Sequence, residues 1–236
     1  MNALYRAHRL RSLRLYFCSS LVLLSSVPGT CLATPVISEV FYDAVGGDDS
    51  LTFVELAGAP GTSLDGWTFE GVNGSGGGVT VTVALSGEIP FDGLFVVADI
   101  DGGGATGVAG ADLLANFDLQ NGPDSVVLRD PDGAIFDAVG YGVFDGTLVF
   151  AGEGAPVADA PAGSSVARAF ADVDTDDNAL DFGVLAVPTP GAAEFQSVPE
   201  PSSGVLAVAG LGTLAWLGRR PRAAPACEES EATRGG

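Results

Sequence analysis

Alternation of apolar and polar residues in Val79–Leu85 (VTVTVAL) constrains the fold of this chain more than any other feature. Every second residue of this run is Val or Leu, and two of the residues between them are Thr. Successive side chains of a strand point to opposite faces, so the pattern predicts a strand with one buried face. Similar short β-rich runs are Val36–Tyr42, Thr52–Ala57, Trp67–Glu70, Leu94–Ala98, Ser125–Arg129, Ile135–Tyr141 and Ser164–Phe170.

Turn-forming residues separate these runs. The turns are Gly46–Asp49, Gly58–Gly61, Asn73–Gly74, Asn121–Pro123 and Asp130–Gly133, and the last of them is typical of a hairpin. Many short strands without a long amphipathic helix predict an all-β fold, an antiparallel sandwich or barrel with seven or more strands within residues 35–193. We expect Trp67, Val81, Val83, Val97 and Val126 to be buried, and Leu113–Leu119 to form a helical turn.

The first 33 residues resemble a secretory signal peptide in their order of features. Four Arg precede an apolar stretch, Leu15–Val27, which Pro28 and Gly29 end. Cys31–Ala33 then offers a small-x-small cleavage site before Thr34. A retained membrane anchor is disfavoured because the apolar stretch is shorter than the roughly 20 residues that span a bilayer. We therefore expect residues 1–33 to be removed on export.

A second apolar segment lies near the C-terminus. Residues 203–218 carry no charge, and Arg219, Arg220 and Arg222 follow at once. A core helix of a globular domain would have a polar face, which this segment lacks. The segment is short for a bilayer, but the Arg side chains can reach the interface. We expect an apolar membrane helix, with the basic cluster and residues 223–236 on the cytoplasmic side.

The residues that precede this segment are Val198–Ser203, with the tripeptide Pro199, Glu200 and Pro201. Tripeptide, apolar segment and Arg cluster, in this order over residues 198–222, resemble a PEP-CTERM sorting signal. That resemblance implies recognition by exosortase, a membrane-embedded transpeptidase-like enzyme of Gram-negative bacteria that make exopolysaccharide. The chain would then be exported through the inner membrane, held transiently in that membrane by its C-terminal segment, and delivered to the cell surface or extracellular matrix.

The composition of residues 34–197 excludes several chemistries. They contain 26 acidic residues and only two basic ones, Arg129 and Arg168, which gives a formal charge of −24. They contain no His, Cys, Lys or Met. Without imidazole or thiolate there is no Ser/His/Asp or Cys/His nucleophile system and no zinc site of the usual kind. Without Lys there is no Schiff base, and the acidic surface disfavours direct binding of nucleic acid.

The order of the strand-forming pieces resembles the lamin tail domain in its bacterial secreted form. The matching pieces are Val36–Tyr42, Phe53–Leu56, Leu64–Trp67, Leu94–Ala98, Asp124–Leu128 and Asp137–Tyr141. The resemblance implies an immunoglobulin-like β-sandwich over residues 34–143 that binds or tethers without chemistry of its own. Residues 144–197 would form an acidic extension of the sandwich and a linker.

One acidic stretch has the composition of a calcium loop. Its oxygen donors are Asp172, Asp174, Asp176, Asn178 and Asp181. Calcium binds six to eight oxygens from such alternating positions. The stretch is not an EF-hand, since Asp177 stands where that loop needs Gly and Gly183 where it needs Glu. A solvated acidic loop without an ion is the alternative, and we expect no other cofactor.

Two functions are consistent with these features. The first is a non-catalytic surface protein that binds extracellular polysaccharide or other surface proteins. The second is a carbohydrate-active enzyme, because paired carboxylates hydrolyse glycosidic bonds without His. The lack of basic groups to position a substrate and the lamin-tail resemblance favour the first.

Overall fold

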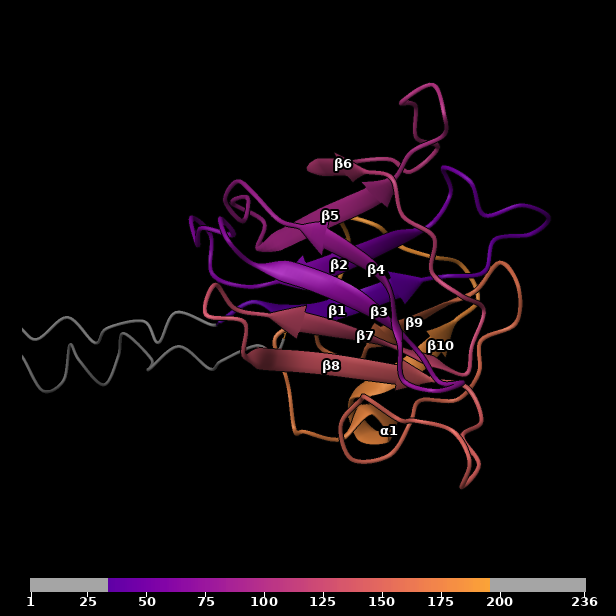
Figure 1. The fold of residues 1–236 in the computed structure, drawn as a ribbon. Helices are drawn as coiled ribbons and strands as arrows, with labels where there is room; N and C mark the ends of the chain where they lie inside the picture. Colours follow the sequence, from indigo (N-terminus) through magenta and orange to yellow (C-terminus); the bar gives the residue numbers. More distant parts are fainter. Residues whose placement is uncertain (1–33, 196–236) are drawn as a thin grey trace, which may run out of the picture.

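The computed structural model describes residues 34–195, and within them it contains ten strands and one short helix (Figure 1). The strands are β1 (Val36–Phe41), β2 (Phe53–Ala57), β3 (Thr68–Asn73), β4 (Val79–Ala84), β5 (Leu94–Asp99), β6 (Leu113–Ala115), β7 (Asp124–Arg129), β8 (Ile135–Tyr141), β9 (Ser165–Arg168) and β10 (Phe182–Leu185). The helix is α1 (Asn178–Asp181). The predicted all-β fold with at least seven strands is confirmed.

The strands form two sheets. The larger has the order β10-β9-β1-β2-β5-β6 and the smaller β4-β3-β7-β8. Paired strands are antiparallel except for β5 and β6, which run parallel. The turn at residues 130–133 joins β7 to β8 as predicted, and its hydrogen bonds are Gly133 N to Asp130 O, 2.9 Å, and Asp130 N to Ala134 O, 3.0 Å. Gly133 has a φ of 83°, which only Gly adopts without strain.

The two sheets lie one in front of the other (Figure 1), and their inner faces share one hydrophobic core. Its side chains include Ile37, Val40, Val54, Leu56, Phe95 and Val97 from the larger sheet and Phe69, Val83, Val126, Leu128, Val139 and Tyr141 from the smaller. Aromatic pairs lock this interior: Tyr42 stacks on Tyr141 with ring centroids 3.9 Å apart, and Phe69 meets Phe117 edge-on at 5.3 Å. Because both sheets contribute, neither layer buries its apolar face without the other.

Burial along β4 follows the predicted alternation only in part. Val83 is buried, as are Val97 and Val126, but Val81 and Trp67 are half-buried at the margin of the core. Val79 is 51% exposed. The reason is that β4 is an edge strand of the smaller sheet, so a neighbouring strand, β3, lies along only one of its two edges.

The predicted helical turn over residues 113–119 is wrong. Leu113–Ala115 forms β6 instead, paired with β5. Asp112 sets this pairing, since its backbone N–H donates to Val96 O and its Oδ2 accepts the Val96 N–H, both at 2.9 Å. The open edge of β5 therefore offered hydrogen bonds that a local helix did not.

The outer face of the larger sheet is covered by the chain that follows β10. We call residues 186–195 the C-terminal strap. Its Glu194 O accepts the Ala171 N–H at 2.7 Å, and Ala171 packs with Val36, Ala57 and Leu94 on the outer face. This covering explains why every residue of β2 and β5 is buried, on both faces.

The predicted signal peptide, residues 1–33, and the sorting signal, residues 198–222 with its apolar segment 203–218, lie outside the described residues, as does the tail 223–236. Among residues 34–195, no helix has the length and apolar character needed to cross a membrane.

Candidate functional site

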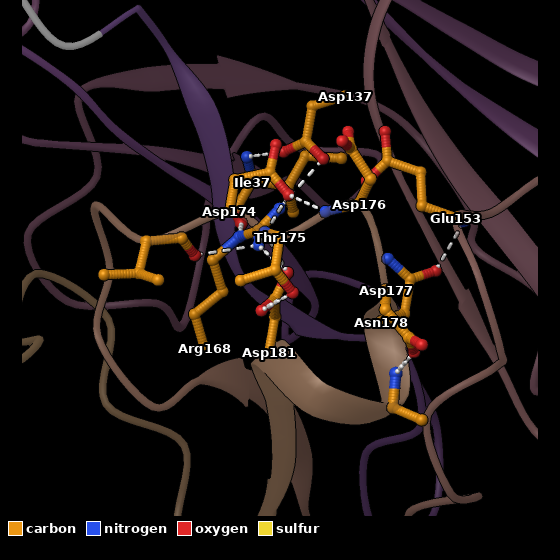
Figure 2. A network of polar contacts seen from close by, with 12 residues as sticks. Ile37, Asp137, Glu153, Arg168, Asp174, Thr175, Asp176, Asp177, Asn178 and Asp181 are labelled. Carbon is orange, nitrogen blue, oxygen red and sulfur yellow. Dashed lines mark hydrogen bonds and ion pairs between the residues drawn. The ribbon is translucent and has the colours of Figure 1, made fainter.

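A buried arginine, Arg168, is the centre of a cluster of polar side chains. Arg168 is the last residue of β9, and its side chain has no solvent exposure. Its Nη2 pairs with Asp137 Oδ1 at 2.9 Å, and its Nη1 pairs with Asp181 Oδ2 at 3.0 Å and Asp174 Oδ1 at 3.3 Å (Figure 2). Three carboxylates from three segments of the chain thus meet on one guanidinium.

Arg168 also donates to two backbone carbonyls. Nε donates to Ile37 O at 2.7 Å, and Nη1 donates to Val173 O at 3.0 Å. The guanidinium carbon lies 4.5 Å from the centre of the Phe182 ring, a cation–π arrangement. A buried charge requires such partners because its desolvation is expensive. The cluster therefore ties β1, β8, β9 and β10 together.

The surroundings of Asp137 raise its pKa, whereas those of Asp181 lower its pKa. Burial raises the pKa of Asp137, and the charge of Arg168 and the Ile37 N–H, 2.5 Å from Oδ2, oppose that shift. Burial also raises the pKa of Asp181, but hydrogen bonds from the backbone and hydroxyl of Thr175, with Arg168, outweigh it and lower the pKa below its usual value. Asp181 is thus held ionised beside the guanidinium.

Glu153 completes the acidic side of the cluster. Its Oε2 is buried and has no hydrogen-bond partner. Burial raises the pKa of Glu153 to about 8, and the charges of Asp137 and Asp174 add to the shift. One carboxylate oxygen each from Asp137, Glu153 and Asp174 lie within 4.8 Å of one another. Such a group either retains a proton on Glu153 or accepts a cation.

The five predicted calcium ligands have different surroundings, and Figure 2 labels four of them, Asp174, Asp176, Asn178 and Asp181. Asp174 and Asp181 contact Arg168. Asn178 is buried, and its side chain accepts the N–H groups of Gly140 and Glu153, both at 2.9 Å, and donates to a backbone carbonyl. Asp172 and Asp176 are exposed.

Only Asp174 of the predicted set belongs to the close carboxylate group found in residues 34–195. Arg168 Nη1 donates to the backbone carbonyl of Val173 and to the carboxylates of Asp174 and Asp181. A fixed cation of the protein thus occupies part of the place that the sequence assigned to calcium.

Sequence reasoning did not assign roles to Arg168, Asp137 or Glu153, although signals for two of them exist. Arg168 is one of only two basic residues in an otherwise acidic stretch, and it lies within the β-rich run Ser164–Phe170. Asp137 stands two residues before Val139 and four before Tyr141, so period-two alternation places it on their buried face. Glu153 lies in an irregular segment without periodicity, and no such signal locates it.

A second acidic feature is a surface cavity of about 310 Å³, which we call the acid pocket. Its lining consists of Asp48, Asp49, Asp99, Asn116, Phe117 and Asp118. Asp99 has both oxygens engaged, with Oδ2 accepting the Ser50 N–H at 2.8 Å and Oδ1 the Phe117 N–H at 2.9 Å. Asp99 therefore shapes the pocket by holding two loops.

Comparison with known proteins identifies one family feature. Residues 197–223 match the PEP-CTERM protein-sorting motif. The match confirms the predicted sorting signal and includes the tripeptide Pro199–Pro201 and the basic residues Arg219, Arg220 and Arg222. No curated protein and no solved structure matches the chain.

Proposed function

We propose that this chain is a surface protein whose acidic β domain binds a matrix component after exosortase has processed the C-terminus. The sorting motif at residues 197–223 carries the proposal, because it implies export, anchoring in the membrane and then processing by exosortase. The secretion machinery and exosortase are therefore its first partners. The matrix-binding role is the further step that we propose.

The β domain supports a role in binding or tethering. It is an all-β domain with two sheets around one core, which agrees with the lamin-tail resemblance and with an immunoglobulin-like sandwich. The two basic residues of the domain are engaged in ion pairs, Arg129 with Glu70 and Arg168 with three Asp. Within the described part of the chain, residues 34–195, no cationic side chain is left to orient an anionic substrate. We propose a non-catalytic domain on these grounds.

The charge of the domain restricts its ligand. At −24 over residues 34–197, it repels phosphate backbones and other polyanions. Carboxylates instead accept hydrogen bonds from hydroxyl and ammonium groups. We propose a neutral or cationic polymer of the matrix, such as exopolysaccharide, or a basic surface protein.

Two experiments test this function. In the producing strain, a chain with Pro199→Ala, Glu200→Ala and Pro201→Ala should stay in the inner membrane fraction while the wild type reaches the surface. The processed wild-type protein, mixed with the strain's own exopolysaccharide, should sediment with the polymer. Surface delivery of the variant would contradict the sorting, and wild-type protein that remains in the supernatant with both polysaccharide and surface proteins would contradict the binding role.

The acid pocket favours a second candidate, a carbohydrate-active enzyme. It gathers four carboxylates in a cavity of a size that suits a small ligand, and glycosidases act through a pair of carboxylates. Asp99 accepts two backbone N–H groups and Asp48 accepts the Ala44 N–H at 2.7 Å, so Asp49 and Asp118 are the candidates for acid and nucleophile. Release of reducing sugar from the exopolysaccharide, abolished by Asp118→Asn, would establish this function in place of the first.

Calcium remains a proposal for the cluster near Arg168. The buried, unpartnered Oε2 of Glu153 supports a cation shared by Glu153, Asp137 and Asp174. Millimolar calcium should then raise the melting temperature of the wild type more than magnesium does, and Asp174→Asn should remove the difference. Asp132→Asn, which changes an exposed Asp of the β7–β8 turn, is the matched control. Equal shifts with both ions would mean that the site is absent.

A further inference from the structure

Two glutamates face each other on the outer side of the larger sheet. Glu39 on β1 and Glu55 on β2 are directly paired in the antiparallel register. A bulge between Ile37 and Glu39 turns Glu39 to the outer face, while Val40 returns to the core. Glu39 is 2% exposed and Glu55 is 0% exposed. Carboxylates are rarely buried to this degree without a cation.

The cover over this pair is the C-terminal strap. Thr189 donates its N–H to Glu39 Oε1 at 2.9 Å and its hydroxyl to Glu39 Oε2 at 2.8 Å. Gly191 donates its N–H to Glu55 Oε2 at 2.7 Å. The strap is thus fastened to the sheet by hydrogen bonds to these two carboxyl groups, in addition to the bond between Ala171 N and Glu194 O.

The sheet itself supplies two more donors. Ser165 Oγ donates to Glu39 Oε1 at 2.5 Å, and Ser38 Oγ donates to Glu55 Oε1 at 2.7 Å. Glu39 therefore accepts three hydrogen bonds and Glu55 two. Hydrogen bonds stabilise the ionised form of a carboxyl group, so Glu55, with fewer donors and deeper burial, is the member of the pair that favours a proton.

Among residues 34–195 no basic residue offsets the pair, since Arg129 and Arg168 are engaged with other carboxylates. The titratable groups that act on Glu55 are Glu39 on β1 and Asp92 in the turn before β5. β5 and the strap place Val96 and Gly191 beside it, which do not titrate, and Glu194 of the strap is exposed. Burial, with the charges of Glu39 and Asp92, raises the pKa of Glu55 to about 7.

We propose that Glu39 and Glu55 form a proton-dependent latch, which holds the C-terminal strap on the sheet while Glu55 is protonated and releases it as Glu55 gives its proton to the solvent. With Glu55 neutral, one negative charge lies under the strap and the hydrogen bonds of Thr189 and Gly191 are made. With both groups ionised, two buried like charges face each other. Opening of the strap exposes them to water.

The direction of the pH dependence follows from the raised pKa. The closed latch binds a proton more tightly than the open strap, in which water reaches the Glu55 carboxyl and its pKa falls toward the ordinary value of 4.5. Closure is therefore fully favoured below pH 4.5 and weakens as the pH rises to about 7. Within this window, each pH unit increases the opening equilibrium by up to about tenfold.

The position of the latch links it to sorting, and this consequence alone rests on the proposed function. The matched sorting motif begins at residue 197, two positions after the last residue of the strap. With the latch closed, the chain is held to the sheet up to Glu194. With it open, the eleven residues 186–196 form a tether from the end of β10, with a reach of up to about 38 Å. An open latch gives exosortase a longer approach to Pro199–Pro201.

The test is hydrogen–deuterium exchange of the full chain in detergent at pH 5, 6, 7 and 8, with rates corrected for the intrinsic pH dependence of exchange. Peptides that contain Thr189 and Gly191 should lose protection by about fortyfold between pH 5 and pH 7. Peptides from β2 and β5 serve as the internal reference and should keep theirs. Glu55→Gln, which carries no titrating proton, should give strap protection that does not change with pH.

Two further variants keep the test decisive if Glu55→Gln folds poorly. Thr189→Val removes a hydroxyl donor of the strap and leaves the sheet intact, so it should lower strap protection at every pH while the slope with pH persists. Glu88→Gln changes an exposed carboxylate and should behave as the wild type. Strap protection in the wild type that is independent of pH, or that falls together with β2, would overturn the latch and leave the sorting function untouched.

Discussion

Removal of the Arg168 guanidinium should destabilise the domain more than any other single loss of charge. In Arg168→Leu, the side chains of Asp137 and Asp181, which are 0% and 3% exposed, lose their shared cation. Loss of one partner from a buried ion pair costs about 3–5 kcal/mol, because the other charge stays buried. For a domain of this size we expect a fall in melting temperature of about 10 °C.

The matched control is the only other basic residue between residues 34 and 197. Arg129 pairs with Glu70 at 2.7 Å, but their side chains are 29% and 16% exposed. Arg129→Leu should therefore reduce the free energy of unfolding by less than about 1 kcal/mol. Both variants are compared by urea unfolding, followed by circular dichroism of the β signal. Equal losses in the two variants would refute the view that Arg168 holds the cluster together.

The double variant Arg168→Leu with Asp137→Leu separates charge from packing. If the loss in Arg168→Leu comes from the unpaired Asp137, the double variant should recover part of the stability. If the double variant loses as much free energy of unfolding as the two single variants together, the destabilisation in Arg168→Leu comes from lost packing instead.

Two further predictions concern other buried groups. Tyr42→Phe removes a hydroxyl that accepts the Ala160 N–H at 2.9 Å and donates to Asp159. Thermal unfolding should show that the free energy of unfolding falls by about 1–2 kcal/mol. An unchanged free energy of unfolding would exclude a role for these bonds in stability. Since burial raises the pKa of Glu153 to about 8, the folded state binds its proton more tightly than the unfolded chain, and stability should fall as the pH rises from 4.5 to 8. Glu153→Gln should make that fall smaller, and an unchanged pH profile of urea unfolding would contradict the assignment.

The fold was largely predictable where the chain alternates regularly. The alternation in Val79–Leu85 predicted a strand, and β4 forms there. The turn residues Asp130–Gly133 predicted a hairpin, and β7 pairs with β8 there. Leu113–Leu119 was misread because its pairing depends on Asp112 contacting β5, sixteen residues earlier in sequence. Edge position likewise decides the exposure of Val79, and the order of strands in a sheet is not a local property of the sequence.

The polar clusters were less predictable for a similar reason. Asp174 and Asp181 stood out in the sequence because they are close together along the chain. Their partner Arg168, however, also binds Asp137, 31 residues away, and the backbone of Ile37, 131 residues away. The burial of Glu39 depends on a bulge and on a strap 150 residues later. The composition shows that residues 34–197 contain few basic side chains, but which carboxylates form ion pairs with them depends on the fold.

The central claim is that exosortase processing at the sorting motif releases the acidic β domain to the surface. Mass spectrometry of the protein recovered from the cell surface of the producing strain tests it most directly. Processing predicts a C-terminal peptide that ends near Pro199–Pro201, with no peptide from the apolar segment 203–218 or from the tail that contains Cys227. Recovery of Cys227 on the surface-exposed protein would contradict the account.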